Sequence, residues 1–180
     1  MLRYLRRTKN KGLNLKIGQS IFVQSYIDAS YGTHCDGKSH TGAIIGIGDA
    51  LAILAKSSKQ KVVTKSSTEA ELIAVTDVIG DVLDLKGFVE ELGYAMNGTE
   101  RPAIVYQDNQ STMKLMESGP PSNSKSKHVR IRTFWLRERI EEGELKMTFC
   151  PTDQMIADGL TKPLQGAQFE RFADQILGKQ

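Results

Sequence analysis

The chain has 180 residues, of which 39% are hydrophobic and 25% are charged, as is ordinary for one globular domain. The net charge of +3 permits contact with phosphates without requiring it. Two cysteines and no Cys/His cluster exclude a disulfide scaffold and a zinc finger, and no apolar run approaches the ~20 residues that span a bilayer. We therefore expect a soluble, intracellular protein.

The first sixty residues predict a basic appendage and a three-stranded meander. Residues 1–10 are expected to form a short basic helix, which Lys11 and Gly12 separate from the rest. Apolar and polar residues then alternate over 21–28 with the two-residue period of a strand, and two further strands are predicted at 41–49 and 50–58. The last two segments predict a hairpin that turns at Gly48 and Asp49.

The rest of the chain alternates helices and strands. Residues 66–93 predict a long helix, because SSTE at its start is a capping signal and Gly93 ends it. The further predicted strands are 102–108 and 144–150, and the further predicted helices are 109–118, 128–143, 153–160 and 169–177. Strands joined through helices are usually parallel neighbours. The sequence therefore predicts an α/β fold in which parallel strands follow an antiparallel meander.

Two aspartates close apolar strands. Asp28 ends the first predicted strand, and Asp108 ends the strand at 102–108. If these strands are parallel neighbours, both carboxylates emerge at the edge where open α/β sheets bind ligands. Either Asp alone would be explained by the preference of this residue for turns, so the pair is the better indication of a site.

Glu71 is the stronger indication of a site. At 100° per residue it falls within about 40° of one apolar stripe of its helix, formed by Val75, Val78, Val82, Leu85 and Val89. A carboxylate in line with that stripe points inward and needs a cation. Glu69 points about 160° away and is expected to form a capping box with Ser66. The alternative for Glu71 is that the helix dipole favours any carboxylate in the first turn.

The fourth candidate is Asp158, in the predicted helix 153–160, where Asp153 is explained more simply as the N-cap. Four converging carboxylates would repel one another unless cations neutralised them. Oxygen ligands favour Mg²⁺ or Mn²⁺, whereas zinc is not expected because no His or Cys accompanies the acids. Two such ions ~3.5–4 Å apart can clamp a phosphodiester.

The pattern of these residues resembles the RNase H family. The matching stretches are SSTEAELIA with Glu71, YQDNQS with Asp108 and ADGL with Asp158, together with Asp28 at the end of the first strand. More closely, KSSTEAEL, KHVRIRTFWLRE and MIADGLTKPL resemble the RNase H region of copia-class LTR retrotransposon polyproteins. Residues 1–17 are similar to the end of the reverse transcriptase that precedes RNase H there, which leaves 18–180 as the RNase H domain.

The resemblance implies an RNase H-like mixed five-stranded sheet flanked by helices. It implies endonucleolytic, two-metal hydrolysis of the RNA strand of RNA/DNA hybrids during reverse transcription, with Mg²⁺ or its substitute Mn²⁺ held by the four acids. Its catalytic Glu is the one followed by Leu, which again selects Glu71. The implied partners are the hybrid and the reverse transcriptase of the same polyprotein, and the implied location is the cytoplasm, within virus-like particles.

The chain departs from the family pattern in two places. The loop CPTDQM lacks the His that many cellular members carry before the last acidic helix, where it is thought to help product release. Turnover is therefore expected to be slower unless His128 or another group substitutes. Copia-class relatives also tend to have Tyr-His-Phe where this chain has Thr133, Phe134 and Trp135.

Nucleic-acid contacts are expected at two places. Basic residues cluster just before and within the helix at 128–143, and the candidates for phosphate contact are Lys125, Lys127, His128 and Arg130. The apolar residues of the same helix, Ile131, Phe134, Trp135 and Leu136, are expected to pack in the core. Asn109 and Gln110 could reach the RNA 2′-hydroxyl or the minor groove, although Asn109 also suits a helix cap. His34 and His40 are interpreted as surface loop residues.

Two other functions stay open at this point. The chain could be a non-catalytic RNase H-like module that binds nucleic acid or scaffolds the reverse transcriptase, although four mutually repelling carboxylates argue against a scaffold. It could also be a related polynucleotidyl transferase, such as an integrase or a junction resolvase. The order of Asp28, Glu71, Asp108 and Asp158 fits RNase H better.

Overall fold

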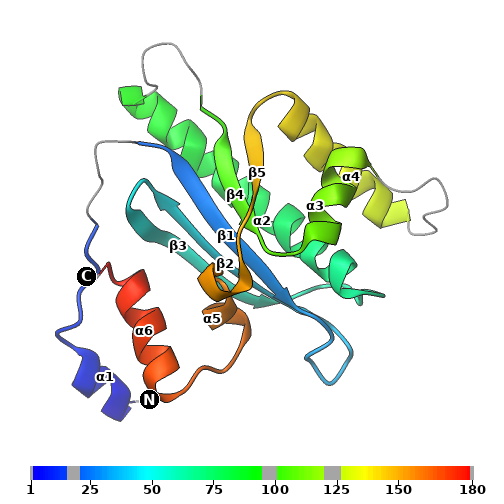
Figure 1. Cartoon of the computed structure of the whole chain (residues 1–180). Helices are drawn as coiled ribbons and strands as arrows, with labels where there is room; N and C mark the ends of the chain where they lie inside the picture. The colour runs from blue at the N-terminus through cyan, green and yellow to red at the C-terminus, as the bar shows by residue number, and fades with distance from the viewer. Residues whose placement is uncertain (1, 16–20, 95–100, 120–126, 179–180) are drawn as a thin grey trace.

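The computed structural model describes residues 2–15, 21–94, 101–119 and 127–178, and Figure 1 shows their arrangement. These residues form one sheet of β1 (Val23–Ser30), β2 (His40–Ile47), β3 (Ala50–Lys59), β4 (Ala103–Gln107) and β5 (Leu145–Phe149). The strand order is β3-β2-β1-β4-β5. β2 pairs antiparallel with β1 and β3, whereas β4 pairs parallel with β1 and β5. The predicted mixed five-stranded fold is confirmed.

Helices cover both faces of the sheet. The main core lies on one face, where the sheet packs against α2 (Ser67–Val89), α3 (Gln110–Ser118) and α4 (Lys127–Glu141). A smaller cluster of Cys150, Met155 and Ala157 packs on the opposite face against Tyr26 and Tyr106, just before α5 (Asp158–Thr161). The remaining described helices are α1 (Leu2–Thr8), α6 (Gly166–Ile176) and the turns Glu90–Tyr94 and Thr152–Gln154.

The alternation of β1 explains how one strand serves both faces. Val23 and Ile27 belong to the main core. Tyr26 points to the opposite face and stacks on Tyr106, with ring centroids 4.5 Å apart. Asp28 follows two residues after Tyr26 and therefore belongs to the face that carries α5.

The prediction for α4 is only partly correct. Leu136 is buried, but Ile131, Phe134 and Trp135 are 58%, 52% and 38% exposed. The buried face of the helix is formed instead by Val129, Thr133 and Leu136, which follow one another at the four- and three-residue spacing of a helical stripe. The prediction treated all four apolar residues as core, whereas the helical period places three of them outside the buried face.

The predicted helix 153–160 is also wrong in detail. The chain instead forms a 3-10 turn at Thr152–Gln154 and a separate short helix that starts at Asp158. Asp153 lies inside that turn and does not cap it, because the residue at the N-cap is Pro151. This break lets Met155 and Ala157 pack into the small cluster while Asp158 starts a new turn beside β1.

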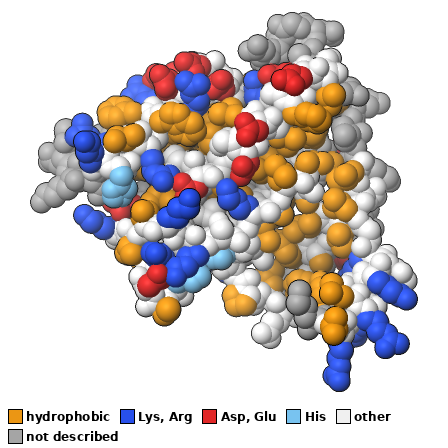
Figure 2. Space-filling view, turned by 180° about the vertical axis from the view of Figure 1, so that it is seen from behind, with side chains coloured by type: hydrophobic (Ala, Val, Ile, Leu, Met, Phe, Trp, Pro, Cys, Tyr) orange, Lys and Arg blue, Asp and Glu red, His pale blue; other side chains and the backbone are white. Residues whose placement is uncertain are grey.

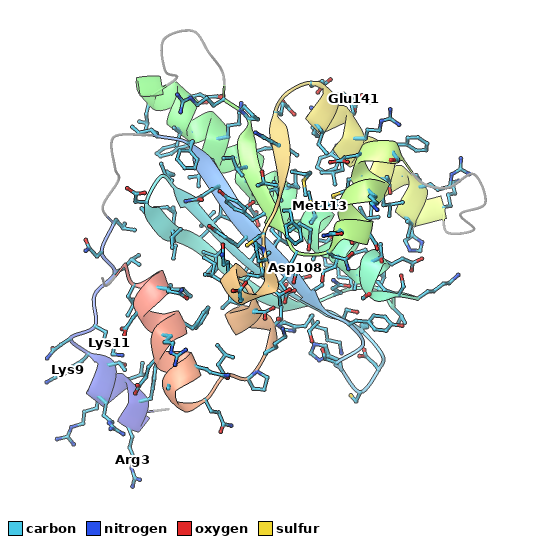
Figure 3. All side chains as sticks on the ribbon, in the orientation of Figure 1. Arg3, Lys9, Lys11, Asp108, Met113 and Glu141 are labelled. Carbon is cyan, nitrogen blue, oxygen red and sulfur yellow. The ribbon has the colours of Figure 1, made fainter. Side chains whose placement is uncertain are left out.

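The N-terminal segment packs on the C-terminal helix. The Asn14 backbone N–H donates to Leu177 O at 3.0 Å, and the Tyr4 ring meets Phe169 edge-on. Figure 3 labels Arg3, Lys9 and Lys11 in this corner, and Figure 2 shows from behind a basic cluster at the matching corner beside a broad area of hydrophobic side chains. Within the described part of the chain, the helices are too short or too polar to cross a membrane.

Candidate active site

Three carboxylates meet at one edge of the sheet. Asp28 comes from β1, Glu71 from α2 and Asp108 from the residue after β4, and one oxygen of each lies within 4.8 Å of the others. The parallel pairing of β1 with β4 sets Tyr26 opposite Tyr106, so Asp28 and Asp108 occupy equivalent positions two residues later. The predicted meeting of these three acids is confirmed.

Glu71 reaches the site from the buried face of α2. Its side chain is only 5% exposed and accepts a hydrogen bond from Gln107 Nε2 at 3.2 Å. The helix start is as predicted, since Glu69 N–H donates to the N-cap Ser66 Oγ at 3.2 Å. The Glu69 carboxylate, however, accepts from the N–H of Lys65 and not from that of Ser66. The two glutamates therefore have different roles, one in the cap and one in the acidic cluster.

Burial and mutual repulsion raise the pKa values of two of these acids. The pKa of Asp28 is raised to about 6, chiefly by burial and further by the charges of Asp158 and Asp108. The pKa of Glu71 is raised to about 9, again by burial first and then by the charges of Asp28 and Asp108. Both carboxyls therefore retain protons at a pH where a free carboxyl has lost them. A bound cation would favour the charged forms.

The donor set fits a hard divalent cation. Carboxylate oxygens are the preferred ligands of such ions, and the three acids already lie close enough to share one. In addition, Asp158 Oδ1 is buried without a hydrogen-bond partner among the described residues. Its other oxygen pairs with Lys162 Nζ at 2.6 Å. An unpaired buried carboxylate oxygen beside three others is the kind of atom that a metal ion satisfies.

Asp158 lies beside the three acids without being part of the closest group. It begins α5, and its charge contributes to the raised pKa of Asp28. α5 approaches β2 at Gly42, where a Cβ would lie 2.7 Å from Thr161 Cγ2 and 2.8 Å from Ala157 O. The close packing that brings Asp158 to the site therefore requires a glycine on the strand.

Each acid of the group accepts a hydrogen bond from a neutral side chain that the sequence analysis did not identify. The donors are Gln107 to Glu71, Thr161 to Asp28 at 2.6 Å and Thr152 to Asp108 at 3.0 Å. The available signal was weak: a Gln inside an apolar strand, and two threonines near the last acid. These contacts orient the carboxylates without neutralising them.

The predicted nucleic-acid contacts lie partly at the site. Asn109 follows Asp108, but its side-chain oxygen caps α3 by accepting from Thr112 N–H at 3.0 Å. Gln110 is exposed, and so are Lys127, His128 and Arg130 at the start of α4. Lys125 lies outside the described residues. Farther along α4, Arg132 pairs with Asp77 and Arg137 with Glu141, so these charges are used within the protein.

The chain is similar in sequence to retrotransposon polyproteins, although no protein-family model matches it. It is 34% identical over 177 residues to the Retrovirus-related Pol polyprotein from transposon RE1 of Arabidopsis thaliana, covering 98% of this chain and 12% of the polyprotein. It is 34% identical over 179 residues to that from transposon TNT 1-94 of Nicotiana tabacum, covering 99% of this chain and 13% of the polyprotein. The chain thus spans about an eighth of these relatives.

Solved structures share the fold at lower sequence identity. The RNase H1 named LC11, isolated from compost, superposes with a TM-score of 0.56 at 16% identity, covering 77% of this chain and 91% of that one. The same enzyme in complex with an RNA/DNA hybrid gives a TM-score of 0.53 at 15% identity, covering 77% and 92%. The chain is therefore homologous, along nearly its whole length, to one segment of the Pol polyproteins of copia-type retrotransposons, and this segment has the fold of an RNase H domain.

Proposed function

We propose that this chain hydrolyses the RNA strand of RNA/DNA hybrids during reverse transcription. The observation that carries the proposal is the meeting of Asp28, Glu71 and Asp108 within 4.8 Å at one edge of an RNase H fold. A scaffold gains nothing from three repelling carboxylates, two of which have raised pKa values. The structure of LC11 RNase H1, which has a similar fold, contains an RNA/DNA hybrid, and this supports the hybrid as the substrate.

The proposed cofactor is a pair of Mg²⁺ ions, with Mn²⁺ as a substitute. Asp28, Glu71, Asp108 and Asp158 would hold them, since all four offer carboxylate oxygens at or beside one point. Such ions activate water and stabilise the leaving oxygen of a phosphodiester. The chain's own contribution is to hold the acids in place, through donors such as Gln107 and Thr161.

Substrate binding is proposed for groups on either side of the acids. Asn109 and Gln110 begin α3 directly after Asp108, where they can face the minor groove of a bound hybrid. Lys127, His128 and Arg130 are exposed at the start of α4 and suit phosphate contacts, together with Lys125.

The proposed biological setting follows from the polyprotein relatives. Residues 1–17 would be the end of a preceding reverse transcriptase, and residues 18–180 the RNase H domain, in cytoplasmic virus-like particles. Support comes from the match to Pol polyproteins over almost all of the chain. The described part of the appendage also packs on α6 through Asn14 and Leu177, which supports a close connection between polymerase and nuclease.

The test is cleavage of an RNA/DNA hybrid with and without Mg²⁺. We expect magnesium-dependent cleavage of the RNA strand, with duplex DNA and branched DNA left intact. Glu71→Gln and Asp108→Asn should each reduce the rate at least ~100-fold. The matched control is Glu69→Gln, which removes a carboxylate from the same helix turn outside the cluster. Robust cleavage by Asp108→Asn would overturn the proposal.

A further inference from the structure

A cavity of about 400 Å³ lies beside the acidic cluster, outside the groups assigned so far. Its lining comes from the loop after β1, from β2 and β3, and from α5, and it includes His34, His40, Ser57 and Lys162. Thr161 also lines the cavity and donates to Asp28, while Lys162 pairs with Asp158. Two residues that line this cavity therefore also contact acids of the site.

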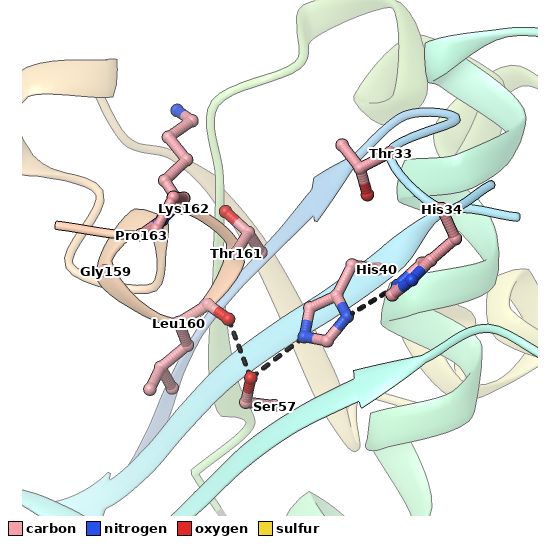
Figure 4. A pocket seen from close by; sticks show the side chains of 9 residues that line it. All are labelled: Thr33, His34, His40, Ser57, Gly159, Leu160, Thr161, Lys162 and Pro163. Atoms are coloured by element: carbon pink, nitrogen blue, oxygen red, sulfur yellow. Dashed lines mark hydrogen bonds between the residues drawn. The ribbon is translucent and has the colours of Figure 1, made fainter.

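Three hydrogen bonds run in series along this cavity, as Figure 4 shows. His34 Nε2 lies 3.0 Å from His40 Nδ1, and His40 Nε2 lies 2.9 Å from Ser57 Oγ. Ser57 Oγ in turn donates to Leu160 O at 2.8 Å. The series ends on the backbone of α5, two residues after Asp158.

The chemistry of these groups fixes the direction of the bonds. A carbonyl oxygen can only accept, so the single hydroxyl proton of Ser57 points to Leu160 and Ser57 Oγ accepts from His40 Nε2–H. A neutral His40 then has a bare Nδ1 and accepts from His34 Nε2–H. In this state Nδ1 of His34, at the outer end of the series, is also bare.

The histidine pair can accept one further proton without losing a bond. The added proton gives the facing nitrogens and His34 Nδ1 two protons in total. One of these protons lies between the two rings and keeps their hydrogen bond, whichever ring carries it. The other proton is on His34 Nδ1. A second added proton would set two N–H groups against each other and break the 3.0 Å contact. Burial and the neighbouring His34 lower the pKa of His40, which agrees with placing the charge at the outer ring.

The lysines around the pair are already paired with carboxylates. Lys162 on α5 lines the same cavity, and its partner is Asp158. Lys59, which is paired with His40 across β2 and β3, and Lys38 both form ion pairs with Asp36 of the loop. A charged histidine pair would thus supply the cavity with a cation that no carboxylate of the described residues matches.

We propose that this cavity binds a phosphate of the nucleic-acid strand that lies across the acidic cluster, with the His34–His40 pair as its contact. A phosphate oxygen would accept from His34 Nδ1–H, and binding would draw one proton onto the pair. The inference rests on the proposed function for its ligand. It assigns a role to two histidines that the sequence analysis interpreted as ordinary loop residues.

The first test measures affinity for an RNA/DNA hybrid by fluorescence anisotropy at pH 6 and pH 8. Every protein in this test also carries Asp108→Asn, so that the hybrid is not cleaved during the measurement. His34→Gln keeps a side-chain N–H for His40 but cannot carry the charge. We expect His34→Gln to weaken hybrid binding about tenfold at pH 6 and about twofold at pH 8. At pH 6 the slope of log Kd against log salt should fall by about one, as expected for the loss of one phosphate contact. Cys35→Ser, an exposed change in the same loop, is the control. Equal affinities for His34→Gln and the control at pH 6 would overturn the proposal.

The second test follows the imidazole nitrogens of His34 by NMR as hybrid is added at constant pH. We expect its Nδ1 signal to move from the bare to the protonated position, and an unchanged signal would contradict the proposal. The two hypotheses fail separately. If His34→Gln weakens binding but the wild-type chain never cleaves, the nuclease assignment is wrong and the phosphate site stands. If cleavage is magnesium-dependent and His34→Gln binds normally, only the phosphate site is wrong.

Discussion

The side chain of Gln107 connects Glu71 to the turn that carries Asp108. Its Nε2 donates to Glu71 Oε2 at 3.2 Å, and its Oε1 accepts from the backbone N–H groups of Asp108 and Asn109 at 2.8 and 3.0 Å. The amide is fully buried at the end of β4. One side chain therefore sets the separation between an acid on α2 and an acid on the sheet.

Replacing Gln107 by Leu should impair both stability and catalysis. The change leaves two backbone N–H groups without their buried acceptor and removes one of the hydrogen-bond donors of the Glu71 carboxylate, which costs about 1–3 kcal/mol of unfolding free energy. We expect kcat to fall about 10- to 100-fold with little change in KM, since Glu71 is displaced but the binding surface is not. Urea unfolding and steady-state cleavage measure the two effects. A stable variant with normal kcat would show that Glu71 is positioned by other contacts.

The fold and the three central acids could be predicted because local periodicity encodes them. The alternation in β1 and the apolar stripe on α2 determine which side chains point inward. The parallel pairing of β1 with β4 then brings Asp28 and Asp108 to the same edge of the sheet. Gln107, Thr152 and Thr161 could not be found in this way. Their roles depend on contacts between segments far apart in the chain, such as Asp28 and Thr161, which are 133 positions apart.

The errors have physical reasons as well. On α4, a run of apolar residues suggested a wider core face than the helix has, and Phe134 and Trp135 are exposed. Around Asp153, the cap preference of Asp favoured a helix start that the chain does not use, since the packing of Met155 and Ala157 takes precedence. On α4, the helical period determines which apolar residues are buried. Around Asp153, side-chain packing overrides the local preference of Asp for an N-cap.

The metal-free protein should lose stability as the pH rises. The pKa values of Asp28 and Glu71 are raised to about 6 and about 9, so the folded state holds these protons more tightly than the unfolded chain. Their contribution to stability is complete below about pH 4 and is lost as the pH rises through 6 and then 9. We expect the Tm in EDTA to fall by ~5 °C or more between pH 5 and pH 9.

Two comparisons check this explanation. Glu71→Gln removes the carboxyl whose pKa is raised further. The Tm of this variant in EDTA should therefore exceed that of the wild type at pH 9 and match it at pH 5. Millimolar Mg²⁺ should raise the wild-type Tm more at pH 8 than at pH 5, because it binds the ionised acids. If Glu71→Gln followed the wild-type curve throughout, Glu71 would not be the group responsible.

Gly42→Ala should displace α5 and reduce activity. The added Cβ would meet Thr161 Cγ2 at 2.7 Å and Ala157 O at 2.8 Å, so the helix that carries Asp158 must move. We expect cleavage to fall at least ~10-fold, with a loss of about 1–3 kcal/mol of unfolding free energy. The control is Gly80→Ala on α2, where a Cβ meets nothing within 4 Å. That change should raise stability by about 0.5–1 kcal/mol and leave cleavage unaltered.

The basic start of α4 should contribute to binding through the charges that have no carboxylate partner among the described residues. Lys127 and Arg130 are exposed, whereas Arg137 forms an ion pair with Glu141 at 2.6 Å. Each of Lys127→Ala and Arg130→Ala should weaken hybrid binding several-fold and lower the slope of log Kd against log salt by about one, because each removes one phosphate contact. Arg137→Ala removes a cation already matched by a carboxylate, so its slope should stay at the wild-type value. Equal slopes for all three variants would mean that the hybrid does not reach this end of α4, and the phosphate contacts would then have to be sought on the His34 side of the acids.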